Sequence, residues 1–194
     1  MADPGYIVDG VLTDGEAWVG IATTTLGSDT AVVTFTSTDD GQVGDFSQYM
    51  DLVIVSYTRG AGGSAVGYLR MNFNNSSGDR HSIQWLYGDG SSAAASSTSA
   101  SSGNQIIGVS LGAAAGANEF SCTVTQLFDI NSGKYKSGIS SSAGDSDGDG
   151  KVLLLGITAL LQAPITEIDL VCDGGDIAAG SAFSLFGVLP RMVA

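Results

Sequence analysis

Few residues in this sequence form a pattern that is typical of catalysis or of ligand or metal binding. The clearest group is Asp145, Asp147 and Asp149 in the segment DSDGDG. In a calcium-binding loop, alternate carboxylates converge on the ion, and a glycine allows the tight turn between ligands. The bidentate acid expected at the twelfth position is absent, because Gly156 stands there. Two interpretations stay open: a calcium site completed by another donor or by water, and an acidic hairpin loop without an ion.

A second motif, G-x-S-x-G at residues 108–112, matches the nucleophile elbow of hydrolases. That elbow needs a strand, a sharp turn and a helix, with a histidine later in the chain. The single histidine, His81, comes earlier, and the run from Gly112 to Gly116 is a poor start for a helix. We interpret the match as chance and expect no enzymatic activity. We expect His81 to be a strand or interface residue rather than a metal ligand.

A third group, Asn72, Asn74, Trp85 and Tyr87, could bind a sugar. Aromatic faces stack on sugar rings, and amides bond to hydroxyls. We prefer the alternative that the aromatic side chains pack across neighbouring strands, which is their usual role in β-sheets.

The third group lies within the stretch from Tyr68 to Gly90, and the sequence of this stretch predicts two strands and a turn. Leu69, Met71 and Phe73 alternate with polar residues, which is the period of a half-buried strand. A second alternating face runs from His81 through Trp85 to Tyr87. We expect an antiparallel pair here, with Phe73 and Trp85 buried in the core.

Short segments rich in β-branched residues recur along the rest of the chain. They predict strands at 17–25, 31–37, 51–58, 106–111, 120–130, 151–157, 166–172 and 182–189, with a hairpin joining the first two and one helical turn at 45–50. Residues 91–103 and 140–150 read as loops, the first because it carries no charge and no large side chain. The pattern predicts an all-β protein, an antiparallel β-sandwich of jelly-roll type, with residues 1–16 as an N-terminal arm or edge strand and 17–190 as a single domain.

Composition narrows the classes of partner. The formal net charge of −13 disfavours nucleic acid and anionic lipid as direct partners. No apolar run reaches transmembrane length, and residues 1–10 lack the features of a signal peptide. We therefore expect no membrane contact and a product that stays in the compartment where it is made. Cys122 and Cys172 alternate with apolar residues, so we expect two buried, reduced thiols, with a disulfide bridge as the alternative.

The segment MNFNNSSGDRHSIQWLYGDGSSAAASS, at residues 71–97, resembles a recurring domain of tailed-phage virion structural proteins, often of marine or cyanophage-like type. Residues 21–36 and 163–188 fit the same family in the same order. The resemblance implies a jelly-roll β-sandwich on the surface of a virion, made in the host cytoplasm.

Within that family the leading expectation is a non-enzymatic capsid decoration, or cement, protein on the head exterior, bound to the major capsid protein or other virion proteins. The alternatives are a receptor-binding tail or collar module that recognises host glycans, and a carbohydrate-active enzyme. The resemblance also implies a homo-trimer. The uncharged segment 91–103 has little reason to be ordered alone, so we expect oligomer contacts at Ser91, Ala94, Ser97 and Ser101.

Overall fold

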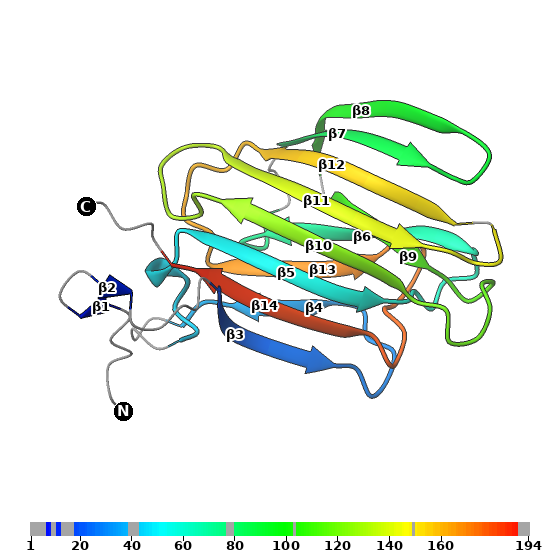
Figure 1. Cartoon of the computed structure of the whole chain (residues 1–194), viewed down its shortest axis with the longest axis horizontal. Coiled ribbons are helices and arrows are strands. Elements are labelled where there is room, and N and C mark those ends of the chain that lie inside the picture. Colours follow the sequence, from blue (N-terminus) through cyan, green and yellow to red (C-terminus); the bar gives the residue numbers. More distant parts are fainter. Residues whose placement is uncertain are drawn as a thin grey trace.

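Two antiparallel β-sheets packed face to face make up most of the protein, which we describe from a computed structural model (Figure 1). The structure describes residues 7–8, 11–12, 18–38, 43–76, 80–102, 104–148 and 150–189. The all-β sandwich expected from the sequence is confirmed. No helix in this described part is long and apolar enough to cross a membrane.

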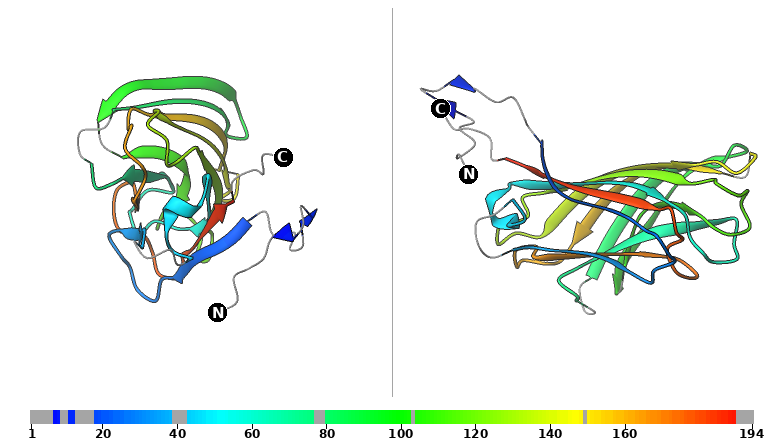
Figure 2. Two further views of the ribbon diagram at one scale, coloured as in Figure 1. Left: turned by 90° about the vertical axis from the view of Figure 1, so that its left-hand side faces the viewer. Right: turned by 90° about the horizontal axis from the view of Figure 1, so that it is seen from below.

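The larger sheet has eight strands, in the order β3 (Trp18–Thr25), β14 (Ala182–Val188), β5 (Asp51–Thr58), β10 (Ser121–Phe128), β11 (Lys136–Gly144), β12 (Lys151–Ala159), β7 (Arg80–Gly88) and β8 (Ala93–Ser102). The smaller sheet has four, in the order β4 (Val33–Thr36), β13 (Glu167–Cys172), β6 (Val66–Phe73) and β9 (Gln105–Leu111). Figure 2 (right) shows the two layers edge-on. Of the predicted N-terminal arm, the structure describes only β1 (Ile7–Val8) and β2 (Val11–Leu12), which pair with each other.

The strand pairing is that of a jelly roll. Early strands pair with late ones in nested fashion: β3 with β14, β4 with β13, β5 with β10, and β6 with β9. The two remaining hairpins, β7–β8 and β11–β12, are insertions between jelly-roll strands. They add four strands to one side of the larger sheet, where they form the upper part of the molecule in Figure 1.

The core lies between the two sheets. Its largest fully buried apolar side chains come from strands of both layers, from the turn after β10 and from η1 (Phe46–Gln48), the helical turn predicted at 45–50. They are Phe46, Phe73, Phe183, Leu52, Ile54, Leu69, Met71, Ile107, Leu111, Leu127 and Ile130. Phe73 is buried as expected. Trp85 is only partly buried, although it packs against this core.

The inserted strands also wrap around β9, the edge strand of the smaller sheet, as the curved layer in Figure 2 (left) shows. Every residue from Ile107 to Leu111 is buried. Hydroxyl groups of the larger sheet satisfy the main chain of β9: the Ser142 Oγ accepts from the Val109 N–H at 2.9 Å, and the Ser121 Oγ donates to the Val109 carbonyl at 2.7 Å. Side chains therefore replace the strand partner that this edge lacks.

Two predicted hairpins are wrong. The strands at 17–25 and 31–37 become β3 and β4, which lie in different sheets. The pair expected within Tyr68 to Gly90 becomes β6 and β7, which also lie in different sheets. In a jelly roll, successive strands cross between layers, because each finds its partner at the other end of the chain.

Two predicted loops are wrong in part. Residues 93–102 of the loop expected at 91–103 form β8. Residues 140–144 of the loop expected at 140–150 belong to β11, whereas 145–148 lie in the turn that follows it, as expected. Serine is usually read as a turn former. In β11, however, Ser140 and Ser142 turn inward, where their hydroxyls bond to Thr125, Thr123 and main-chain carbonyls. The strand assigned at 151–157 is confirmed as β12.

Candidate functional site

The most distinctive surface is the outer face of the larger sheet, the side turned away from the smaller sheet. Seven large apolar side chains are exposed on it: Trp18, Tyr57, Leu86, Val124, Ile139, Val152 and Leu154. We call these residues, with the uncharged residues between them, the neutral face. Apolar patches of neighbouring exposed side chains are uncommon on monomeric proteins and often mark sites of contact with another protein.

Strand register assembles the neutral face from distant parts of the chain. One row of directly opposed residues crosses five strands, namely Val124, Ser141, Leu154, Leu86 and Ala95. The next row contains Cys122, Ala143, Val152, Gly88 and Ala93. Directly opposed residues in antiparallel strands share one face of the sheet, so these rows form a continuous surface.

Charge is almost absent from this surface, although the chain carries a formal net charge of −13. The eight strands contain one acidic residue, Asp51, which is buried at a strand end and accepts hydrogen bonds from Gln126 and the Asp129 main chain. Lys136 and Lys151 turn inward to main-chain carbonyls and to the Tyr68 hydroxyl. The other charged residue of these strands is Arg80, whose side chain lies outside the described structure. Depletion of charge is typical of the centre of a protein–protein interface.

The neutral face is hollowed where it lacks side chains. An open hollow of about 670 Å³ lies beside Gly156 and is walled by Leu86, Leu154 and Gln84, with Ala95 and Ser97 of β8 at its rim. No atom lies within 4 Å of the position that a Gly156 side chain would occupy. Such a hollow can accept a bulky side chain from a partner.

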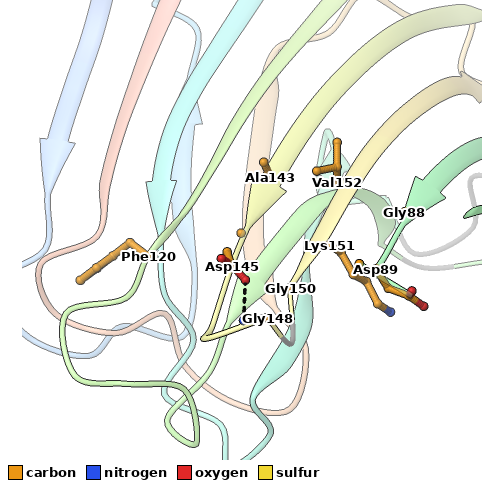
Figure 3. A pocket seen from close by; sticks show the side chains of 11 residues that line it. Gly88, Asp89, Phe120, Ala143, Asp145, Gly148, Gly150, Lys151 and Val152 are labelled. Atoms are coloured by element: carbon orange, nitrogen blue, oxygen red, sulfur yellow. Dashed lines mark hydrogen bonds between the residues drawn. The ribbon is translucent and has the colours of Figure 1, made fainter. Parts of the chain in front are cut away.

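A second hollow, of about 620 Å³, lies where two turns meet at one end of the same face (Figure 3). Asp89 and Gly90 come from the β7–β8 turn, and Asp145 and Gly148 come from the β11–β12 turn. The Phe120 ring, at the side of this hollow, stacks on Tyr57 with a centroid distance of 4.9 Å. Glycines, carboxylates and an aromatic ring could together hold a hydroxyl-rich ligand.

The Asp89 side chain forms its hydrogen bonds within the β7–β8 turn. Its carboxylate accepts hydrogen bonds from the main-chain N–H groups and hydroxyls of Ser92 and Ser91, at 2.7 to 3.0 Å. These bonds, above all the one from the Ser92 N–H, hold the pKa of Asp89 well below its usual range. The side chain is therefore an anion that shapes the turn, and it is unsuited to proton transfer at neutral pH.

The predicted calcium loop forms the β11–β12 hairpin turn. Asp147 and Gly148, in the loop between the last paired residues Gly144 and Lys151, have positive φ angles of 52° and 92°, a backbone region that aspartate and glycine tolerate. The Asp145 carboxylate accepts the Gly148 N–H at 3.0 Å. Asp149 lies outside the described residues, and among the described ones no three metal-binding side chains cluster. The turn thus accounts for this sequence without an ion, and calcium binding stays a prediction.

The calcium hypothesis predicts a change that the turn alone does not. Millimolar calcium should raise the melting temperature of the wild-type chain, and a chelator should reverse the rise. An Asp147→Asn variant tests the carboxylate, because asparagine tolerates the positive φ of this position while removing the charge. Calorimetry that finds equal melting with calcium and with chelator would exclude the site.

The other candidates for chemistry lie inside the sandwich. Ser110 of the G-x-S-x-G match is buried within β9, and its hydroxyl lies 3.2 Å from the Cys172 sulfur. Gly108 and Gly112 are needed for close packing, since a side chain at either would meet neighbouring atoms at 2.3 and 2.1 Å. His81 is buried on β7. The match therefore reflects packing in a strand, without the turn and helix of an elbow.

The cysteines differ from each other, which corrects one expectation. Both are free, but Cys172 is buried and Cys122 is exposed on the neutral face. Cys122 alternates with Val124 as predicted, yet the side on which both lie faces outward. Burial raises the pKa of the Cys172 thiol to about 11. Since the thiolate is the reactive form, Cys122 is the thiol open to reagents.

The residues proposed for sugar stacking do not share a surface. Asn74, at the end of β6, ties the chain together by accepting from Thr166 and Glu167 N–H groups. Trp85 and Tyr87 lie on β7 in the other sheet, on the side that packs against the core. The Asn72 side chain accepts a hydrogen bond from the adjacent Phe73 N–H.

The predicted oligomer contacts fall in or next to the edge strand β8. Ser91, Ala94 and Ser97 are exposed, and the Ser101 side chain lies outside the described structure. Sequence reasoning missed the neutral face itself. The signal was the run Val152 to Ile157, where apolar residues occupy both alternating positions of an exposed strand.

The fold and this surface define a jelly-roll β-sandwich with an extended, uncharged and partly apolar face. No protein-family model, no curated protein and no solved structure matches the chain.

Proposed function

We propose that this protein is a non-enzymatic structural subunit of a virus particle, which works by burying its neutral face against a neighbouring protein of the shell. The observation that carries the proposal is the neutral face, an apolar and uncharged surface across a large sheet in a strongly acidic chain. The viral setting rests on the resemblance of residues 21–36, 71–97 and 163–188 to tailed-phage virion proteins.

The place we propose is the head exterior, with the chain acting as a decoration protein on the major capsid protein. A subunit of this kind stabilises a shell by adding interface area between capsid subunits, and the added binding free energy opposes their separation. Acidic turns and the smaller sheet would then face solvent. The three-fold symmetry that the resemblance implies stays a prediction, which averaged images of particles would check.

Cys122 provides the test, because it lies on the neutral face. In the free chain its thiol should react readily with a maleimide, whereas on the assembled particle it should be protected. A Cys122→Ser variant should lose this reaction, which confirms that the buried Cys172 does not contribute. Equal reactivity of Cys122 in the free chain and on the particle would exclude burial of the face, and absence of the chain from purified particles would exclude the viral setting.

The hollow between the β7–β8 and β11–β12 turns supports a second function, recognition of a host glycan. Its Phe120 ring and the Asp145 carboxylate are suited to a sugar ring and its hydroxyls. A glycan array probed with the purified chain tests this function. Binding that a Phe120→Ala variant loses would favour the receptor-binding role over decoration.

A further inference from the structure

The edge strand β8 is the least supported part of the larger sheet. It pairs with β7 along one side and ends the sheet. All side chains from Ala93 to Thr98 are exposed, and they are alanine, serine and threonine only. A strand gains most of its stability from packing on its faces and from partners on its sides. β8 has one partner within this chain and little packing.

The two edges of the smaller sheet are protected in ways that β8 is not. The edge of β9 is satisfied by serine hydroxyls, and β4 is only 4 residues long. β8 is 10 residues long and has neither charge nor proline, the usual means of blocking an edge. Among the described residues, no main-chain bond joins the free side of β8 to another segment. Its outward N–H and C=O groups are thus a template for a further strand.

We propose that β8 pairs antiparallel with the β8 strand of a second copy of this chain, so that two larger sheets become one continuous sheet. The contact is two-fold symmetric, and such a contact closes on itself instead of growing into a fibre. Charge favours a second copy at this edge, because two chains of −13 can approach here without bringing carboxylates together. The neutral face then also runs without a break across both copies.

Charge also selects the direction of pairing. Asp89 stands in the turn just before β8, and it stays ionised at any pH near neutral. Parallel pairing would place the two Asp89 turns side by side, whereas antiparallel pairing puts them at opposite ends of the contact.

The register of β7 and β8 limits the length of the contact. Ile83 pairs with Thr98 and His81 with Ser101, so β8 bulges between these points. A bulge ends regular pairing on the free side as well. Directly opposed residues share one face, so the two-fold axis must pass at a residue position, and the paired segment is Ala94 to Thr98 with the axis at Ser96.

Cross-linking of the full chain tests the proposal, and it does not depend on the viral setting. In a Cys122→Ser background, a Ser96→Cys variant should form an intermolecular disulfide under mild oxidation, because the two Ser96 positions lie beside the axis. An Ala22→Cys variant, on the exposed β3 edge at the other end of the sheet, is the matched control and should stay uncross-linked.

Light scattering provides the second measurement. The wild-type mass should be an even multiple of 19.6 kDa, since a two-fold contact can also join two trimers. Lysine at both Ser96 and Ser97 should halve that mass with the circular dichroism spectrum unchanged, because both side chains are exposed and lysine blocks a strand edge. Lysine at Ala22 should leave the mass unchanged.

Three results would overturn the proposal: a strictly monomeric or trimeric chain, no disulfide at Ser96→Cys, or a disulfide between Ser96→Cys and Ala22→Cys chains in a mixture. The last would mean head-to-tail pairing of β8 with β3. Since Cys122 is not on β8, its protection on particles is measured separately, and each hypothesis can fail without the other.

Discussion

Replacing Phe73 with alanine is expected to lower the free energy of unfolding by about 3–5 kcal/mol. Phe73 is 1% exposed and belongs to the central core cluster, at the end of β6 where the smaller sheet faces the larger one. Removing the ring leaves a cavity that the closely packed strands cannot fill. The cost is therefore the lost hydrophobic free energy of the ring plus the free energy of the cavity. Chemical denaturation followed by tryptophan fluorescence measures the change.

The matched control is Tyr135→Ala, which removes an aromatic ring that is 54% exposed. Its free energy of unfolding should change by no more than about 0.5 kcal/mol, as is usual for surface sites. A loss below about 1 kcal/mol for Phe73→Ala would show that the two sheets do not close on each other at this point.

Gly108→Ala is expected to have a comparable effect through a different cause. A side chain at Gly108 would lie 2.3 Å from the Thr123 Oγ1 and 2.8 Å from the Ser142 Oγ. Both are short, buried side chains that cannot move aside, and the Ser142 hydroxyl also accepts the Val109 N–H. Overpacking costs about 1–3 kcal/mol, and loss of this hydrogen bond leaves a buried N–H unsatisfied at a similar further cost.

Gly156→Ala is the control for this variant, since it makes the same substitution on β12, where nothing lies within 4 Å. We expect its free energy of unfolding to stay within about 0.5 kcal/mol of the wild-type value or to rise slightly. If both variants unfold at the same denaturant concentration, the hydroxyl contacts between β9 and the larger sheet are not tight, and the enclosure of β9 would need revision.

The hydroxyl contacts around β9 explain why this chain uses serine and threonine inside its core. A buried strand edge needs hydrogen-bond partners, and in the described part of the chain no further strand of the smaller sheet lies beside β9 on that side. Ser121, Ser140 and Ser142 supply the bonds from the larger sheet. The serine and threonine content of the chain therefore belongs partly to the interior.

The neutral face follows from the same arrangement. The insertions β7–β8 and β11–β12 extend one sheet beyond the other, so that their inner sides cover β9 while their outer sides stay open. Val152 and Leu154 alternate with the buried Leu153 and Leu155. A strand with apolar residues on both faces is typically buried on both faces. Burial of the outer face against another protein is consistent with this pattern.

Local sequence determined where most strands lie and which residues point to the core. Alternation at Leu69, Met71 and Phe73 identified β6, and the apolar run from Asp51 to Thr58 identified β5, because side-chain direction in a strand depends only on position along it. The aspartate–glycine turn at Asp147 and Gly148 was also readable as part of a hairpin loop, although β11, the strand before it, was not predicted. These features depend on a few neighbouring residues.

Which strands pair depends on packing between segments that are far apart in the sequence. Alternation does not name a partner, and the links after β3 and after β6 could have closed hairpins. The chain instead joins β3 to β14 and β6 to β9, since that nested pairing lets both sheets bury their apolar sides against each other. It is this pairing that sets Val124, Leu154 and Leu86 in one row, although they are far apart in sequence. The sequence showed one strand of the neutral face, the run Val152 to Ile157, but not the face as a whole, because the face exists only once distant strands are in register.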